Sequence, residues 1–190
     1  MTKEEFEIKL IEDLVKGILN IHNYIRENKY ILQENKDYFR EYFLNDPEYA
    51  CHYSFIIDKC PRKETRKAAC KDPEWAYYYA YYVDQFPRDD TRKEVCKSSH
   101  WAYKYARFVD NYPRDDTRKT SCKDPYSAYK YAYYVDNYPR DDTRKASCKD
   151  PYSAYYYAYY VDDCPREDTF NGAKGSDWEE FYIKNIGTPY

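Results

Sequence analysis

Small, aromatic and β-branched residues recur along the chain with the spacing of one face of a helix. Ala76, Tyr79, Ala80 and Val83 stand at positions i, i+3, i+4 and i+7, so their side chains form a single stripe on an α-helix. The pattern predicts a helix here and an equivalent helix wherever the stripe returns. It returns at Ala102, Tyr105, Ala106 and Val109, at Ala128, Tyr131, Ala132 and Val135, and at Ala154, Tyr157, Ala158 and Val161.

The stripe belongs to a unit of 26 residues that occurs five times between residues 46 and 175. A period of about 20 to 50 residues is typical of solenoid proteins, in which one unit is too small to bury its own apolar face and neighbouring units stack to form the core. We number the units as copies one to five. They cover residues 46–71, 72–97, 98–123, 124–149 and 150–175.

Each copy predicts two short helices. In copy two, Asp72 precedes a proline and is suited to cap the first helix. Pro87 disfavours helical geometry in the residue before it, so the first helix should end there. The same proline is expected to start the second helix, in which Asp90 followed by Arg92 matches the preference of the helix dipole. This second helix is expected to run for about nine residues, to Cys96.

The two ends of the chain differ from the repeats. Residues 1–45 and residues 176–190 carry apolar side chains three and four positions apart, which predicts an N-terminal and a C-terminal helical cap. We expect an all-α fold, an α-solenoid of five 26-residue helix-turn-helix repeats (46–175) between the two caps, in one continuous domain. Its handedness is left open. The apolar residues of the caps are Phe6, Leu10, Leu14, Ile18, Ile21 and Ile25, and Trp178, Phe181, Tyr182 and Ile186.

Composition changes the expected chemistry of the core. Leu, Ile, Val and Phe make up only 29 of the 190 residues, which is less than the roughly 20% below which a strongly charged chain is typically disordered. Tyrosine compensates, because the chain has 28 tyrosines and each ring can be buried while its hydroxyl keeps a hydrogen-bond partner. We therefore expect a core built of tyrosine.

Charge and hydropathy argue against some classes of partner. The 31 Lys and Arg against 34 Asp and Glu give a net charge of -3, which produces no field that would draw the whole chain onto nucleic acid or an acidic membrane. No apolar run is long enough to predict a membrane span. Acidic residues stand where a secretory signal has its basic segment. We expect no membrane partner and a cytoplasmic location.

The cysteines do not predict a disulfide or a metal centre. Four of them stand at one repeat position, where equivalent atoms of stacked helices are about 8 to 10 Å apart, whereas a disulfide needs Cα atoms within about 7 Å. No CxxC or CxxH spacing occurs, so we expect reduced, buried thiols, no metal and no cofactor. The four are Cys70, Cys96, Cys122 and Cys148, and the role of Cys51, Cys60 and Cys164, including a redox role, is left open.

The sequence shows no catalytic motif. Carboxylate pairs such as Asp89 and Asp90 recur from copy to copy, whereas an active site is normally single, so we interpret them as helix caps rather than acid-base groups. No glycine-rich phosphate loop, GxSxG or HExxH motif is present. We expect that the protein is not an enzyme.

The positions that vary between copies indicate a candidate binding surface, because packing does not fix them. The seventh and tenth residues of the copies vary among Tyr, Lys, Arg, His and Phe, and the sixth is mostly tyrosine. They are expected opposite the apolar stripe, either as a solvent-facing side that tolerates tyrosine or as a recognition surface, since tyrosine gives contact area at low entropic cost. The candidate binding residues are Tyr77, Tyr78, Tyr81, Tyr103, Lys104, Arg107, Tyr129, Lys130, Tyr133, Tyr155, Tyr156 and Tyr159.

The segment DPEWAYYYAYYVDQFP, residues 72–87, resembles the short DPEWAYxYAxxV-type helical repeats of bacteriophage and bacterial proteins. The resemblance covers the five copies and not the ends. It implies a helical repeat fold and a bacteriophage origin, in which case the partner would be a host protein in the host cytoplasm. It carries no site residue over to this chain.

The sequence favours a non-catalytic repeat scaffold that binds another macromolecule through a tyrosine-rich face, with a protein as the expected partner. The alternative is a nucleic-acid-binding repeat protein, in which tyrosines stack on bases while Lys104, Arg107 and Lys130 contact phosphates. A small-molecule site in an aromatic groove is a third interpretation. The oligomeric state is left open. A row of positive charge would come from four Arg-Lys pairs at 66–67, 92–93, 118–119 and 144–145.

Overall fold

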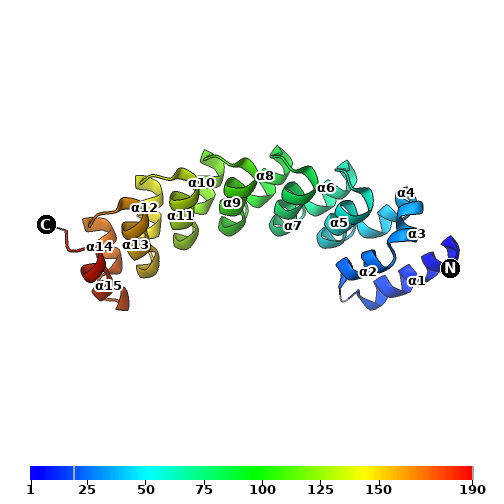
Figure 1. Ribbon diagram of the computed structural model, residues 1–190, viewed down its shortest axis with the longest axis horizontal. Helices are drawn as coiled ribbons and strands as arrows, with labels where there is room; N and C mark the ends of the chain where they lie inside the picture. The colour runs from blue at the N-terminus through cyan, green and yellow to red at the C-terminus, as the bar shows by residue number, and fades with distance from the viewer. Residues whose placement is uncertain (19, 190) are drawn as a thin grey trace. The chain divides into compact units, whose positions relative to one another are not determined.

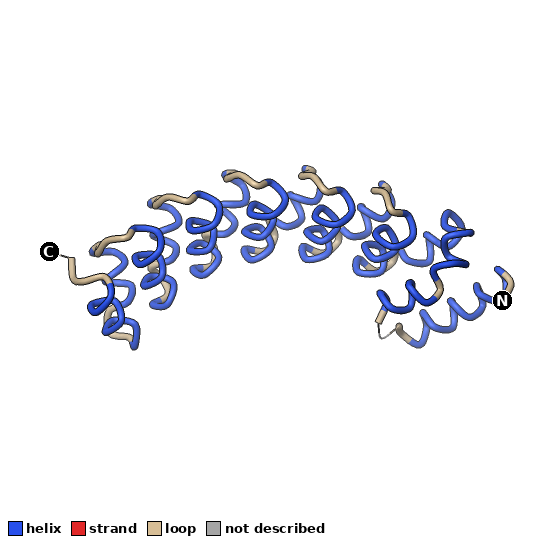
Figure 2. Tube along the Cα trace, in the orientation of Figure 1, coloured by secondary structure: helices blue, strands red, loops and turns tan. Residues whose placement is uncertain are grey.

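The computed structural model describes residues 1–18 and 20–189, and all regular secondary structure in those ranges is helical (Figure 1). Figure 2 shows the helices in pairs that repeat along the chain, which confirms the predicted all-α solenoid of repeats. The chain divides into two compact units, Met1–Glu94 and Val95–Tyr190, which are described separately. Within the described ranges, every helix is too short or too polar to span a lipid bilayer.

The first unit contains the N-terminal helices, copy one and most of copy two. α2 and the first helices of copies one and two, α5 and α7, contact one another in order (Figure 1). The elements are α1 (Lys3–Lys16), α2 (Ile21–Glu27), α3 (Lys29–Glu34), α4 (Lys36–Phe39), the 3₁₀ helix η1 (Arg40–Phe43), α5 (Pro47–Tyr53), the π-helix η2 (Ser54–Asp58), α6 (Lys63–Ala69), α7 (Pro73–Tyr78), the π-helix η3 (Tyr79–Asp84) and α8 (Asp89–Val95), which reaches the boundary.

The second unit contains copies three to five and the C-terminal helix. Its first helices, α9, α11, α13 and α15, contact one another in order and form one layer, and the second helices, α10, α12 and α14, form the other (Figure 1). The elements are α9 (Ser99–Tyr105), the π-helix η4 (Ala106–Asp110), α10 (Asp115–Ser121), α11 (Pro125–Tyr131), the π-helix η5 (Ala132–Asp136), α12 (Asp141–Ser147), α13 (Pro151–Tyr157), the π-helix η6 (Ala158–Asp162), α14 (Glu167–Ala173) and α15 (Asp177–Asn185).

The first helix of a copy begins as its sequence predicts. The carboxylate of Asp46 accepts a hydrogen bond from the N–H of Tyr49 at 3.1 Å, and Asp124 accepts one from the N–H of Ser127 at 2.8 Å. A proline occupies the first helical turn in both cases. The Asp-Pro pairs therefore act as helix starts.

The same helix changes from α to π geometry before it ends. Its last five or six residues are π-helical, with bonds between residues five apart, such as the N–H of Asn137 to the carbonyl of Ala132 at 2.9 Å. A left-handed residue follows, with φ between 51° and 58°. Neither feature follows from the apolar stripe, whose spacing is α-helical. The left-handed residues are Lys59, Gln85, Asn111, Asn137 and Asp163.

The second helix begins later and is shorter than predicted. α10 begins at Asp115, two residues after Pro113, and has seven residues. Its cap is Arg114, whose backbone is extended and whose N–H donates to the hydroxyl of Tyr131 at 2.9 Å. The prediction that the proline starts this helix is therefore wrong, because a bond to the next copy holds the following residue in an extended conformation.

Tyrosines of the apolar stripe form the core between copies. Tyr131 is fully buried, and its hydroxyl donates to the carbonyl of Arg114 at 3.0 Å and lies 3.1 Å from the hydroxyl of Thr117. Tyr157 makes the same contacts with Arg140 and Thr143 one repeat later. Each hydroxyl thus bonds to the start of the second helix in the preceding copy. The buried hydroxyl groups of both tyrosines therefore have hydrogen-bond partners.

A buried ion pair also joins successive copies. Arg118 of copy three donates to the carboxylate of Asp136 of copy four, with N–O distances of 3.0 to 3.2 Å. Arg144 and Asp162 repeat the pair one copy later. Burial raises the pKa of Asp136, and the guanidinium of Arg118 opposes that shift. Each partner needs the other, because a single buried charge is costly.

The repeat framework extends into both ends of the chain. Arg40 donates to Asp58 across 18 residues, and the hydroxyl of Tyr53 donates to a carbonyl 17 residues earlier, the separations found inside the repeats. Near the C-terminus, the hydroxyl of Tyr182 accepts from the N–H of Arg166 at 3.1 Å. The stretch between α1 and copy one is therefore a diverged repeat unit, although its sequence lacks the repeat pattern.

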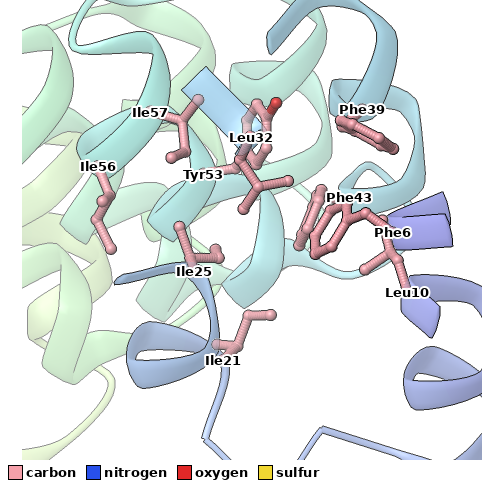
Figure 3. Close-up of a cluster of buried hydrophobic side chains, with 10 residues drawn as sticks. All are labelled: Phe6, Leu10, Ile21, Ile25, Leu32, Phe39, Phe43, Tyr53, Ile56 and Ile57. Carbon is pink, nitrogen blue, oxygen red and sulfur yellow. The ribbon is translucent and has the colours of Figure 1, made fainter. Parts of the chain in front are cut away.

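The N-terminal part of the first unit has a core made mostly of aliphatic and phenylalanine side chains, with one tyrosine, Tyr53 (Figure 3). α1 contributes Phe6 and Leu10, and the ring of Phe6 meets that of Phe39 edge to face, with centroids 5.1 Å apart. Leu14 and Ile18 are partly buried against this cluster. Its buried members are Phe6, Leu10, Ile21, Ile25, Leu32, Phe39, Phe43, Tyr53, Ile56 and Ile57.

Candidate interaction surface

Four of the twelve predicted binding residues are buried. They occupy the sixth position of copies two to five and expose only 3 to 7% of their surface. In the second unit, Tyr129 packs in a cluster with Ala132 and Tyr157. A first helix has neighbours on both sides as well as its own second helix, so burial extends past the apolar stripe. The expectation of an exposed position is therefore wrong for Tyr77, Tyr103, Tyr129 and Tyr155.

The other eight predicted residues keep part of their surface exposed. Tyr81 in the first unit and Tyr159 in the second are the most exposed, at 41% and 42%. These two therefore fit the predicted solvent-facing side best. Tyr78, Lys104, Arg107, Lys130, Tyr133 and Tyr156 are half-buried.

The exposed face also contains aromatic residues that the variable positions do not reveal. The eleventh residue of copies two, three and five, Tyr82, Phe108 and Tyr160, is 39 to 48% exposed. This position is aromatic in four of the five copies, so a search for variation passes over it. The sequence signal that would identify this position is an aromatic residue that recurs in most copies but lies outside the apolar stripe.

The second unit brings five of these tyrosines together, and we call Tyr133, Tyr134, Tyr156, Tyr159 and Tyr160 the aromatic surface. Tyr133 of copy four meets Tyr134 at 4.6 Å and Tyr160 of copy five at 5.3 Å between ring centroids. Tyr156 stacks on Tyr160 at 5.7 Å, and Tyr159 meets Tyr160 edge to face at 4.8 Å. Every ring therefore rests against at least one other ring and is held in place.

Two of the predicted cations lie on tyrosine rings. The guanidinium carbon of Arg107 is 3.6 Å from the ring centroid of Tyr134. The Nζ atom of Lys130 is 5.2 Å from the ring centroids of Tyr126, Tyr129 and Tyr134. Both distances are within the range of cation–π attraction. Both side chains are half-buried, and their charges contact rings of the protein itself.

Three of the four arginines in the Arg-Lys pairs, Arg92, Arg118 and Arg144, are buried. Three arginines pair with aspartates of the next copy: Arg66 with Asp84 at 3.0 Å, Arg118 with Asp136 at 3.0 Å and Arg144 with Asp162 at 2.8 Å. The exposed Asp115 lies 2.7 Å from Arg118 as well. The lysines of the four pairs, by contrast, are exposed: Lys67, Lys93, Lys119 and Lys145.

The four cysteines at the repeated position are half-buried, so the expectation of fully buried thiols is wrong. Three of them are nevertheless poor nucleophiles. Burial raises the pKa of Cys70 and Cys148 to about 12 and that of Cys122 to about 11. Because the thiolate is the reactive form, these thiols are inert at neutral pH. Cys164, by contrast, is exposed.

The first unit has a pocket of about 490 Å³ with mostly aromatic walls. Inside it the Nδ1 atoms of His22 and His52 lie 3.3 Å apart. Burial, and then the neighbouring His22, lowers the pKa of His52 to about 4, so its imidazole is neutral at physiological pH. The residues that line the pocket are His22, Cys51, His52, Phe55, Glu74, Trp75, Tyr78 and Tyr82.

No family model, curated protein or solved structure matches this chain. The resemblance to bacteriophage and bacterial repeats therefore stays a prediction. The fold and the surface define a class of protein, a helical repeat protein with a partly exposed group of packed tyrosines.

Proposed function

We propose that the protein is a non-catalytic repeat scaffold that binds another protein through the aromatic surface of its second unit. The observation that carries the proposal is a group of five tyrosines from two successive copies, of which Tyr159 and Tyr160 are 42% and 46% exposed. Contiguous exposed aromatic patches on soluble proteins mark interaction sites. Tyrosine in particular is enriched at protein interfaces and at their energetic hot spots.

The order of the aromatic surface supports binding at a low entropic cost. Tyr156 and Tyr160 are stacked with their ring planes 5° apart, and Tyr133 bridges to the next copy. Side chains that are already ordered lose little freedom when a partner covers them. The hydroxyl groups of exposed tyrosines also offer hydrogen bonds at the edge of such an interface.

Nucleic acid is less well supported as the partner. Arg107 and Lys130 lie on tyrosine rings, and Arg118 is buried in an ion pair, so few of the expected cations project toward a phosphate backbone. If the chain comes from a bacteriophage, we propose a host protein as the partner.

The proposal is tested by capture from extracts of the cells that contain the protein, with tagged full-length chain and with half of each sample treated with nuclease. The variant is Tyr159→Ser with Tyr160→Ser. Its control is Tyr112→Ser with Tyr138→Ser, because these loop tyrosines of the same unit are 48% and 49% exposed and lie outside the aromatic surface. Melting temperatures of all three proteins should agree.

The expected result is a stoichiometric protein that the wild type and the control retain, that the Tyr159/Tyr160 variant loses, and that survives nuclease. Retention by that variant would contradict the proposal. Loss of every protein together with nucleic acid after nuclease would favour a nucleic-acid partner instead, because phosphate contacts would then carry the binding.

A further inference from the structure

The pocket of the first unit is a box of aromatic rings set at different angles. The centroids of Trp75 and Tyr78 are 5.5 Å apart with planes at 50°, and His52 meets Trp75 at 5.4 Å and 62°. Phe55 meets Tyr82 at 5.6 Å and 57°, and Tyr78 stacks on Tyr82 at 6.0 Å. Ring faces carry negative charge density, so rings around one space favour a cation there.

The charged groups at this pocket are acidic. Glu74 lines it, and a carboxylate oxygen of Glu48 lies 3.8 Å from Nε2 of His52. Burial, followed by the charges of Asp46 and Glu74, raises the pKa of Glu48. Among the described residues that line the pocket there is no lysine or arginine, and His52 is neutral above its lowered pKa.

At the equivalent repeat positions of the second unit, positively charged side chains of the protein itself contact an aromatic ring. There the guanidinium carbon of Arg107 lies 3.6 Å from the ring centroid of Tyr134, and Nζ of Lys130 lies 5.2 Å from it. These three residues come from the tenth position of copy three and the seventh and eleventh positions of copy four. The aromatic frame between those copies thus contains two cations supplied by the protein itself.

The pocket of the first unit is the equivalent place 52 residues earlier in the sequence. There Phe55 replaces the arginine, Tyr78 replaces the lysine, and Tyr82 keeps the central tyrosine. Both built-in cations are therefore replaced by rings, and the walls gain Trp75 and the carboxylate of Glu74. The frame that holds cations in the second unit is thus present in the first with rings at both places, and the described residues that line it include no lysine or arginine.

We propose that this pocket binds a quaternary ammonium group, which either a free compound such as choline or a trimethylated lysine side chain would supply. Cation–π attraction to several rings and the charge of Glu74 would hold it. The volume of about 490 Å³ lies in the range of about 300 to 1,000 Å³ that is usual for small-ligand sites. The site lies in the first unit and stands whether or not the second unit binds a protein.

Titration calorimetry of the full-length protein with choline and with 3,3-dimethylbutanol, its uncharged carbon isostere, tests the need for charge. Choline should bind at least about tenfold more tightly, because only a cation gains from the rings and the carboxylate. Equal affinities, or no binding of choline at millimolar concentration, would overturn the proposal. A trimethyl-lysine blocked at both ends, compared with choline, shows which source of the ammonium group the pocket prefers.

Tyr78→Lys is the decisive variant, because it supplies the cation that the fourth copy already has at this position. Choline binding should weaken by at least about tenfold, since the pocket would hold its own ammonium group. Tyr30→Lys is the matched control, as it adds the same charge to a highly exposed residue of the same unit outside the pocket, and it should bind choline like the wild type. Wild-type affinity in Tyr78→Lys would contradict the proposal.

Glu74→Gln gives a second test, because it removes a charge from the pocket and leaves all of its aromatic rings in place. It tests the proposal even if Tyr78→Lys alters the fold. The side chain of Glu74 lines the pocket, so the loss of its charge should weaken choline binding about threefold to tenfold while leaving the binding of the uncharged isostere unchanged. An unchanged choline affinity in this variant would count against the site.

Discussion

The N-terminal core and the core of the second unit combine apolar packing and directional bonds in different proportions, since the first keeps the Arg40–Asp58 pair but adds a large apolar cluster. The first consists mostly of packed apolar side chains such as Phe6, Leu10 and Phe39. In the second, the hydroxyl of Tyr131 bonds to the preceding helix pair and Arg118 pairs with Asp136. Apolar contact is non-directional, whereas hydrogen bonds fix direction and distance. The comparison shows that a chain poor in leucine can still pack its repeats in a constant arrangement. Directional hydrogen bonds and ion pairs between successive repeats set that arrangement.

The largest expected effect comes from breaking the buried ion pair. Arg118→Ala should lower the free energy of unfolding of the second unit by about 3 to 5 kcal/mol, because it leaves the carboxylate of Asp136 buried without its partner. Urea unfolding followed by circular dichroism measures this loss. The double variant Arg118→Met with Asp136→Leu should recover most of it. A loss below about 1 kcal/mol in the single variant would mean that the pair behaves like an exposed one.

Removing one hydroxyl compares the two cores directly. Tyr131→Phe should cost about 1 to 3 kcal/mol, because the N–H of Arg114 and the hydroxyl of Thr117 lose a buried partner. Tyr53→Phe in the N-terminal core should cost only about 1 kcal/mol, since its hydroxyl makes one bond, to a backbone carbonyl. Chemical denaturation of both variants gives the two values. Equal losses would remove the distinction between the cores.

The histidine pair should make the first unit sensitive to acid. The folded pKa of His52 is lowered from 6.5 to about 4, so the unfolded chain binds the proton more readily, and stability present above pH 6.5 is lost as the pH falls toward 4. Because the ring is partly exposed, we expect a loss of about 1 to 2 kcal/mol. Melting curves between pH 7 and pH 4 measure it. His52→Gln should flatten the dependence, and an equally steep dependence in that variant would exclude His52 as its cause.

The smallest expected effect concerns the left-handed residue after the π-helix. Gln85 has φ of 58°, a conformation that glycine adopts without strain, so Gln85→Gly should raise stability by about 0.5 to 1 kcal/mol. Asn137 has the same φ in the second unit, but asparagine tolerates it better, so Asn137→Gly should change stability less. Thermal melting of the two variants distinguishes them. A larger gain at Asn137 would contradict this ranking.

The paired helices could be predicted from the sequence because their cause is periodic. The stripe of Ala76, Tyr79, Ala80 and Val83 and the Asp-Pro start act within one helix, and the repetition of both in successive copies defines the stacking unit. The tyrosine core follows from composition in the same way, since no other residue in the chain supplies enough buried area.

The features that could not be predicted from the sequence depend on how each copy packs against the next. The burial of Tyr129 arises from contact with Tyr157 of the following copy, and a single helical wheel does not contain that contact. The diverged repeat before copy one bonds through the carbonyl of Lys36, and a backbone acceptor leaves no trace in the sequence. Its one detectable signal is Arg40 and Asp58, which have the 18-residue separation of Arg66 and Asp84.

The central claim is that the aromatic surface of the second unit binds a protein. The most direct test is calorimetric titration of the captured, purified partner into the wild type, the Tyr159→Ser/Tyr160→Ser variant and the Tyr112→Ser/Tyr138→Ser control, at low and high salt. We predict affinity weakened at least about thirtyfold in the first variant and less than about threefold in the control, with a shallow dependence on salt. Unchanged affinity in the Tyr159/Tyr160 variant, or a steep linear fall of log affinity with log salt, would contradict the account.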